Sequence, residues 1–303
     1  MKPDRSLAAA LGEGVLVLDG GLSNQLEAQG CDLSDALWSA RLLADAPEQI
    51  EAAHAAYVRA GAQVLITSSY QATFEGFARR GVERAETARL LARSVELARV
   101  AGERTEREIW VAASVGPYGA MLADGSEYRG RYGMSVAELE RFHRPRIEVL
   151  AGSGADVLAL ETVPDAYEAE ALLRAVGRYG AVPVWLSYTV EGAHTRAGQR
   201  LEDAFGLVAG LDQVVAVGVN CCDPADAGPA AEIAAAVTGK PVVVYPNSGE
   251  RWDAGTRRWH GGTTFAPATT AAWRTAGARL IGGCCRVGPD TVAALAASLT
   301  AMP

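Results

Sequence analysis

The sequence predicts an α/β protein folded as a single (β/α)8 barrel. Short β-branched or apolar runs recur eight times, helix-like segments lie between most of them, and no polar linker or detectable repeat divides the 303 residues. Alternating strands and helices form a parallel sheet, and one barrel typically uses about 250 residues. The alternative, an open doubly wound sheet, would carry a glycine-rich phosphate-binding fingerprint after a strand, and none is found.

The predicted strands are short and apolar, as expected for strands buried on both faces. In chain order they are Val15–Leu18, Gln63–Ile66, Ile109–Ala113, Val157–Leu160, Val182–Ser187, Val214–Val219, Val242–Tyr245 and Arg279–Ile281. The segments between them repeat apolar residues with a period near 3.6, which predicts helices. These helices are Pro47–Ala60, Ala85–Ala101, Ser135–Ala151, Ala166–Tyr179, Glu202–Ala209 and Ala225–Thr238.

Polar residues follow each predicted strand, where barrels of this class build their active sites. The strand ends read Asp19-Gly20-Gly21, Thr67-Ser68-Ser69, Ser114, Glu161-Thr162, Ser187-Tyr188, Asn220-Cys221-Cys222, Tyr245-Pro246-Asn247-Ser248 and Gly282-Gly283-Cys284-Cys285. Two connections, Gly116–Met134 and Pro246–Gly262, are longer than a barrel needs. We therefore expect one pocket at this end of the barrel, with both connections overhanging it.

Composition excludes several classes of function. With 49% hydrophobic and 21% charged residues, the chain can bury a sizeable core. Its net charge of -8 argues against a nucleic-acid or anionic-membrane partner. The sequence has neither an apolar run long enough to span a bilayer nor a signal-peptide pattern, so we expect a cytoplasmic protein.

Four of the five cysteines form two vicinal pairs, a poor pattern for structural disulfides. Cys221 would meet Cys284 and Cys285 at the barrel mouth, provided that the chain bends after Gly282-Gly283. Three thiolates and one open position are typical of a catalytic metal site, and zinc is the best guess. The alternative is that these cysteines are only small buried residues, which is how we interpret Cys31. The Cys222 side chain would face the helices and would not bind the metal.

Two carboxylates, Asp19 and Glu161, close the first and fourth predicted strands. Together with glycine N–H groups they would suit the ammonium and carboxylate groups of an amino acid. The four histidines show no metal or triad spacing. Aromatic residues of the overhanging connections could hold a cationic ligand by cation–π attraction, although packing is the more common role. They are Tyr118, Tyr128, Tyr132, Trp252 and Trp259.

Taken together, Val219-Asn220-Cys221 and Gly282-Gly283-Cys284-Cys285-Arg286 resemble the zinc-binding signatures of the homocysteine S-methyltransferase family. The resemblance extends over nearly the whole chain and is closest to bacterial members that use S-methylmethionine. Its other motifs include Leu18–Gly21, Gly61–Gln63, Ser69–Thr73, Ser114–Gly119, Leu122–Gly130, Phe142–Arg146, Glu161-Thr162 and Tyr245–Glu250.

The resemblance implies one homocysteine-binding barrel domain, residues 1–303, that transfers a methyl group from S-methylmethionine, or less efficiently S-adenosylmethionine, to L-homocysteine and yields methionine. It implies zinc bound by Cys221, Cys284 and Cys285. The homocysteine amino and carboxylate groups would be held by Asp19, Gly20, Thr67 and Glu161. Alternatives are a betaine-using relative, a zinc-dependent barrel hydrolase with hydroxide at the open position, and a zinc-binding protein without catalysis.

Overall fold

The fold is described from a computed structural model of the chain. It describes residues 3–34, 37, 39–180, 182–253 and 258–300, and the side chains of all of these except 251–253 and 258–259. Trp252 and Trp259, two of the aromatic residues singled out above, therefore have side chains outside the described part. No helix in these ranges combines the length and apolar character needed to cross a bilayer.

Eight parallel strands form the centre of the molecule, in the spatial order β1-β12-β9-β8-β5-β4-β3-β2. Their bounds are β1 Leu16–Val17, β2 Val64–Ile66, β3 Trp110–Val115, β4 Val157–Val163, β5 Val184–Tyr188, β8 Val214–Asn220, β9 Val242–Tyr245 and β12 Ala278–Ile281. The ends of the sheet meet where Leu18 bridges Val64 and the Asp19 N–H donates to the Val64 carbonyl at 3.0 Å. The predicted barrel and its eight strands are confirmed.

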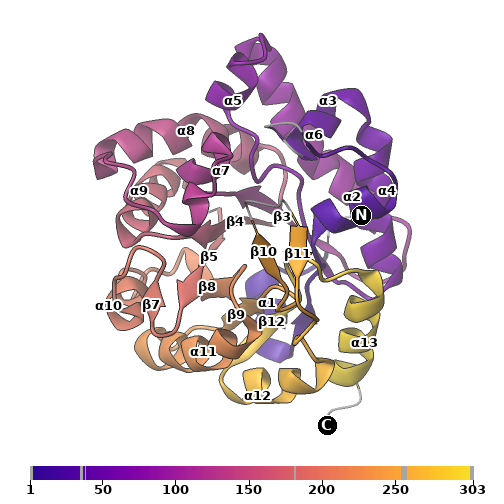
Figure 1. Cartoon of the computed structure of the whole chain (residues 1–303), viewed down its shortest axis with the longest axis vertical. Coiled ribbons are helices and arrows are strands. Elements are labelled where there is room, and N and C mark those ends of the chain that lie inside the picture. Colours follow the sequence, from indigo (N-terminus) through magenta and orange to yellow (C-terminus); the bar gives the residue numbers. More distant parts are fainter. Residues whose placement is uncertain (1–2, 35–36, 38, 181, 254–257, 301–303) are drawn as a thin grey trace.

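Helices surround the strands (Figure 1). Those with predicted counterparts are α4 Pro47–Arg59, α6 Arg84–Gly102, α8 Val136–Gly152, α9 Ala166–Val176, α10 Leu201–Gly206 and α11 Pro224–Thr238. The others are α1 Leu7–Glu13, α2 Leu22–Ala28, α3 Ser39–Asp45, α5 Phe74–Ala78, α7 Tyr118–Leu122, α12 Thr270–Thr275 and α13 Pro289–Thr300, with 3-10 turns η1 Ser126–Tyr128, η2 Gly177–Tyr179 and η3 Pro267–Thr269.

The strands bury both faces because successive side chains alternate. Along β4, Leu158 and Leu160 join the core between sheet and helices, whereas Val157 and Ala159 point into the barrel. Helix α1 belongs to the inner core: its buried Leu7, Ala10 and Leu11 pack with the inward residues of the strands. Figure 1 shows α1 behind the strands, so this helix closes one end of the barrel.

The other end carries the long connections. Residues 116–134 contain α7 and η1, and residues 246–262 contain the hairpin β10 Arg251–Asp253 and β11 Arg258–His260. A second hairpin, β6 Val190–Glu191 and β7 His194–Thr195, follows β5. Figure 1 shows the β10–β11 hairpin in front of the strands, on the side opposite α1. The overhang predicted for this hairpin is confirmed.

Candidate metal centre

Three thiols meet at the open end of the barrel. Cys221 follows β8, and Cys284 and Cys285 follow β12. All three sulfur atoms lie within 4.8 Å of one another, with Cys221 Sγ 3.7 Å from Cys285 Sγ. This convergence of thiols from strands far apart in the chain agrees with the prediction made from the sequence.

The backbone leaves the extended state at both ligand segments. Cys221 has φ 51°, a left-handed conformation that is uncommon outside glycine. After β12 the chain passes through Gly282 and Gly283, where a Cβ atom would lie 2.4 Å from Leu18 Cβ and 2.2 Å from Val287 Cγ1. Only glycine fits at these two positions, and the turn that follows lets both vicinal thiols reach one point.

The spacing of the thiols fits a metal ion. A tetrahedral ion with metal–sulfur bonds of about 2.3 Å holds its sulfur ligands about 3.8 Å apart, close to the distance found here. Hydrogen bonds from Cys221 and Cys284 lower the pKa of Cys285 well below its ordinary value, which favours a thiolate in the cluster. Among the described residues, this is the only group of three or more histidine, cysteine or acidic residues close enough to share an ion.

The two remaining cysteines lie outside the cluster. Cys222 belongs to the core between the sheet and the helices, as strand alternation predicted. Burial raises the pKa of its thiol well above the ordinary value. Cys31 is half-buried against the same core, in line with its interpretation as a packing residue.

Glu161 stands in a ring of polar side chains that continues the inward-facing positions of the strands. Ser114 Oγ donates to Glu161 Oε1, and Tyr245 Oη donates to Oε2 at 3.0 Å. The ring extends to Ser187, which donates to Asn220 Oδ1 at 2.8 Å. Burial raises the pKa of Glu161 to about 7, and the two hydrogen bonds only partly offset this.

The two carboxylate oxygens of Asp19 differ in their hydrogen bonding. The Ile66 N–H donates to Oδ2 at 2.8 Å, tying β1 to β2, while the buried Oδ1 has no hydrogen-bond partner among the described residues. Burial, and then the charge of Glu161, raise the pKa of Asp19 well above its ordinary value. Two buried carboxyl groups whose ionisation is opposed by burial favour a cationic ligand.

The other two predicted substrate residues also have structural roles. A Cβ atom on Gly20 would lie 2.2 Å from the Val287 carbonyl oxygen, so the segment after β12 packs directly on this glycine. Thr67 Oγ1 accepts from the Ser114 N–H at 3.0 Å and lies 2.7 Å from Ser69 Oγ. Because Ser69 donates its own proton to the Ser114 carbonyl, Thr67 must donate to Ser69. The Thr67 hydroxyl therefore donates one hydrogen bond and accepts another within the protein.

The connection after β3 reaches the thiols through η1. Tyr128 Oη lies 3.1 Å from Cys221 Sγ, so the predicted overhang is confirmed here. The other two tyrosines of this connection pack instead: the Tyr118 ring lies 5.2 Å from that of Tyr132 and 4.8 Å from that of Phe142 on α8. Packing, the more common role considered for loop aromatics, applies to these two.

A buried polar network anchors this connection to the barrel. Arg146 donates to the Gly116 carbonyl and, at 2.6 Å, to His143 Nδ1. The proton of His143 must therefore lie on Nε2, which is 2.9 Å from Glu168 Oε1. The Tyr118 N–H donates to the same oxygen at 2.6 Å. The role of His143 could not be predicted from the sequence, because it depends on Glu168 of another helix and on the connection after β3.

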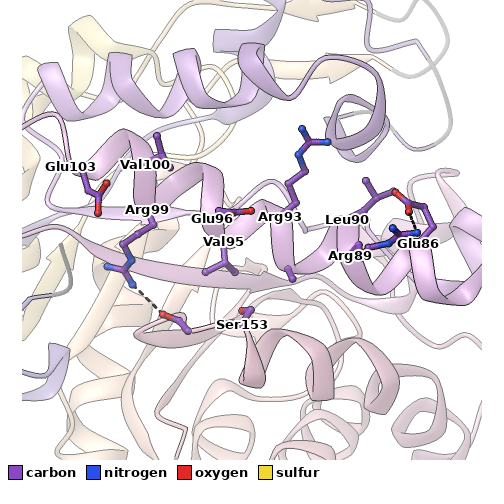
Figure 2. Close-up of a pocket in the computed structure, with 12 residues that line it drawn as sticks. Glu86, Arg89, Leu90, Arg93, Val95, Glu96, Arg99, Val100, Glu103 and Ser153 are labelled. Atoms are coloured by element: carbon purple, nitrogen blue, oxygen red, sulfur yellow. Dashed lines mark hydrogen bonds and ion pairs between the residues drawn. The ribbon is translucent and has the colours of Figure 1, made fainter.

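A groove on the outer surface offers no comparable chemistry. It lies along α6 and is lined by Glu86, Arg93, Arg99 and Ser153 among others (Figure 2). Its charges are partly paired, since Arg89 lies 2.5 Å from Glu86 and Arg99 Nη2 lies 2.7 Å from Asp156 Oδ2. The groove is a feature of the helical layer, and the candidate site remains the barrel mouth.

Comparison with known proteins gives a consistent result. A sequence model of the family described as "Homocysteine S-methyltransferase" matches residues 16–299. The Homocysteine S-methyltransferase of Escherichia coli is 48% identical over 293 residues, covering 93% of this chain and 94% of that protein. Homocysteine S-methyltransferase YbgG of Bacillus subtilis is 42% identical over 299 residues, with 93% and 94% covered.

A solved structure agrees over almost the whole length. The crystal structure of the homocysteine methyltransferase MmuM from Escherichia coli, in a metallated form, superposes with a TM-score of 0.87 at 45% identity. The match covers 95% of this chain and 98% of that one. Sequence and structure therefore show that this chain belongs to the homocysteine S-methyltransferase family.

Proposed function

We propose that the protein, as one domain over residues 1–303, transfers a methyl group from S-methylmethionine to the sulfur of L-homocysteine and forms methionine. The observation that carries this proposal is the cluster of three thiols from β8 and β12, which shares the barrel mouth with the polar ring of Glu161. Membership of the family supports the same reaction.

The thiols of Cys221, Cys284 and Cys285 would hold Zn²⁺, because an all-sulfur donor set selects a soft or borderline metal. When bound, the ion supplies a positive charge that stabilises the deprotonated form of a substrate thiol at its open position. The spacing of the thiols, described above, supports this assignment.

Asp19 and Glu161 would bind the ammonium group of homocysteine. Burial raises the pKa of both carboxyl groups, so the pocket without ligand opposes their ionisation. An ammonium group removes that penalty, and Ser114 and Tyr245 hold Glu161 in place. Gly20 would allow close approach of the substrate to the backbone, and Thr67 would act through Ser114, which its hydroxyl helps to position.

In the reaction, the homocysteine sulfur forms a bond to the donor methyl carbon while the bond from that carbon to the donor sulfonium breaks. The electron pair of the broken bond stays on the donor sulfur, which leaves as a neutral thioether. No acid is needed to expel this group. The protein's part is to orient both substrates in line and to keep water out of the pocket.

The decisive experiment measures methionine formation from homocysteine by zinc-loaded protein, with S-methylmethionine, S-adenosylmethionine or betaine as donor. We expect turnover with S-methylmethionine and, less efficiently, S-adenosylmethionine. A Cys284→Ala variant should lose turnover and tightly bound zinc, whereas Cys222→Ala should keep about one zinc per chain because its thiol faces the helices. Absence of methionine with every donor, from protein that binds zinc, would reject the proposal.

A further inference from the structure

A third buried carboxylate lies near the thiols and has no role in the scheme above. Glu127, on η1, is only 7% exposed, and its Oε2 has no hydrogen-bond partner in the part of the chain that the structure describes. Its own backbone N–H and that of Gly125 donate hydrogen bonds to the carboxylate. Burial raises its pKa to about 7.

Three observations place Glu127 near the pocket. It precedes Tyr128, whose hydroxyl lies 3.1 Å from Cys221 Sγ. The turn η1 lies against β4, the strand that carries Glu161. Burial, and then the charge of Glu127, raise the pKa of Tyr70, and the charge of Cys221 acts on both groups. Glu127 therefore shares the electrostatic environment of the thiols.

The position of Glu127 is held by close packing. A Cβ atom on Gly119 would lie 2.4 Å from the Glu127 backbone nitrogen, so α7 and η1 fit together only with glycine there. The buried network of Arg146, His143 and Glu168 fixes the start of the same connection through Gly116 and Tyr118. A carboxylate oxygen held in a buried wall without a partner is costly, unless a cationic ligand compensates it.

We propose that Glu127 binds the α-ammonium group of the methyl donor. This inference rests on the proposed function, in which the donor carries two positive groups, a sulfonium and an ammonium. The sulfonium charge disappears during transfer, so a carboxylate beside it would stabilise the bound donor more than the transition state. The ammonium charge persists throughout the reaction. Pairing it with Glu127 therefore strengthens donor binding without stabilising the bound donor more than the transition state.

The test compares Glu127→Gln with the wild-type protein, both zinc-loaded. The matched control is Asp124→Asn, which removes the same charge from an exposed site on the same connection. The donors are S-methylmethionine and 4-(dimethylsulfonio)butanoate, which has the same skeleton without the amino group. Donor KM, homocysteine KM and kcat are measured, and calorimetry gives donor binding independently of turnover.

We expect Glu127→Gln to raise the KM and the Kd for S-methylmethionine by about thirtyfold or more, as for loss of one partner of a buried charge pair. Homocysteine KM, and the KM of the donor without the amino group, should stay within about twofold. Glu127→Asp should recover part of the loss, and Asp124→Asn should match the wild type.

Three results would overturn the inference. The first is an unchanged KM for S-methylmethionine in Glu127→Gln, and the second is an equal loss with both donors, which would place Glu127 at the sulfonium or in a purely structural role. A rise in homocysteine KM instead would assign Glu127 to the other substrate and also reject it. Failure of the proposed function would look different, because the wild-type protein itself would then form no methionine.

Discussion

The two ends of the barrel interior are built from the same strands and are equally buried, yet their chemistry is opposite. At the closed end, Leu16, Trp110 and Val157 pack with helix α1 in an apolar cluster. At the open end, the next inward positions are polar, including Ser114 and Glu161, both at most 5% exposed.

This difference separates residues that stabilise the fold from residues that we propose to bind a ligand. Apolar burial at the closed end lowers the free energy of the folded state directly. The buried carboxyl groups at the open end raise it, because their ionisation is opposed until a cation arrives. Mutations at the two ends should therefore have opposite signatures in stability and activity.

The largest expected effect is on stability at the closed end. Leu11→Ala removes a side chain that is 1% exposed and should reduce the free energy of unfolding by about 3 kcal/mol or more. Denaturant unfolding measures the loss, and kcat of the protein that remains folded should be unchanged. Loss of activity without loss of stability would contradict the division between the two ends.

Glu161→Gln should show the reverse signature. Homocysteine KM should rise by about a hundredfold, because one partner of a buried charge pair is lost. Steady-state kinetics at saturating S-methylmethionine measures the effect, with Glu148→Gln on the exposed surface of α8 as control. If both variants behaved alike, Glu161 would not hold the substrate.

The third effect is the pH dependence of stability in the same variant. The pKa of Glu161 is about 7 in the folded protein and ordinarily 4.5, so the unfolded chain releases this proton first as pH rises. Wild-type stability should therefore fall between pH 4.5 and 7, relative to Glu161→Gln, by up to about 1.4 kcal/mol per pH unit.

Urea unfolding of both metal-free proteins at pH 4.5 and pH 8 measures this difference. The free energy of unfolding of the variant should equal that of the wild type at pH 4.5 and exceed it at pH 8. A wild type that gains stability over this interval, relative to the variant, would mean that the folded protein favours the Glu161 carboxylate. Glu161 would then stabilise the folded state, as the residues of the closed end do.

Much of the fold could be predicted from the sequence, because buried strands and amphipathic helices leave strong local patterns. All eight strands were found, although β4 extends to Val163 and α10 ends at Gly206, earlier than predicted. Helix α1 was not predicted. Its partners are the inward side chains of strands throughout the chain, and no local pattern records such contacts.

The candidate site was predictable where its chemistry is concentrated in rare residues. The vicinal pair Cys284-Cys285 stood out in the sequence, and strand alternation correctly separated Cys222 from Cys221. Glu127 was missed because one glutamate in a loop has no distinguishing pattern. Its burial depends on the packing of η1 against Gly119 and β4, which only the folded chain shows.

Closure of the sheet has a consequence for how the protein is made. Leu16 on β1 pairs with Leu280 on β12, a contact between segments separated by about 260 residues, and such long-range contacts form slowly. Until β12 leaves the ribosome, the nascent chain holds only one of the three clustered thiols, and its sheet has two open edges prone to aggregation. Metal binding by all three thiols would therefore have to wait for β12, and it would report the moment at which the ring of strands closes.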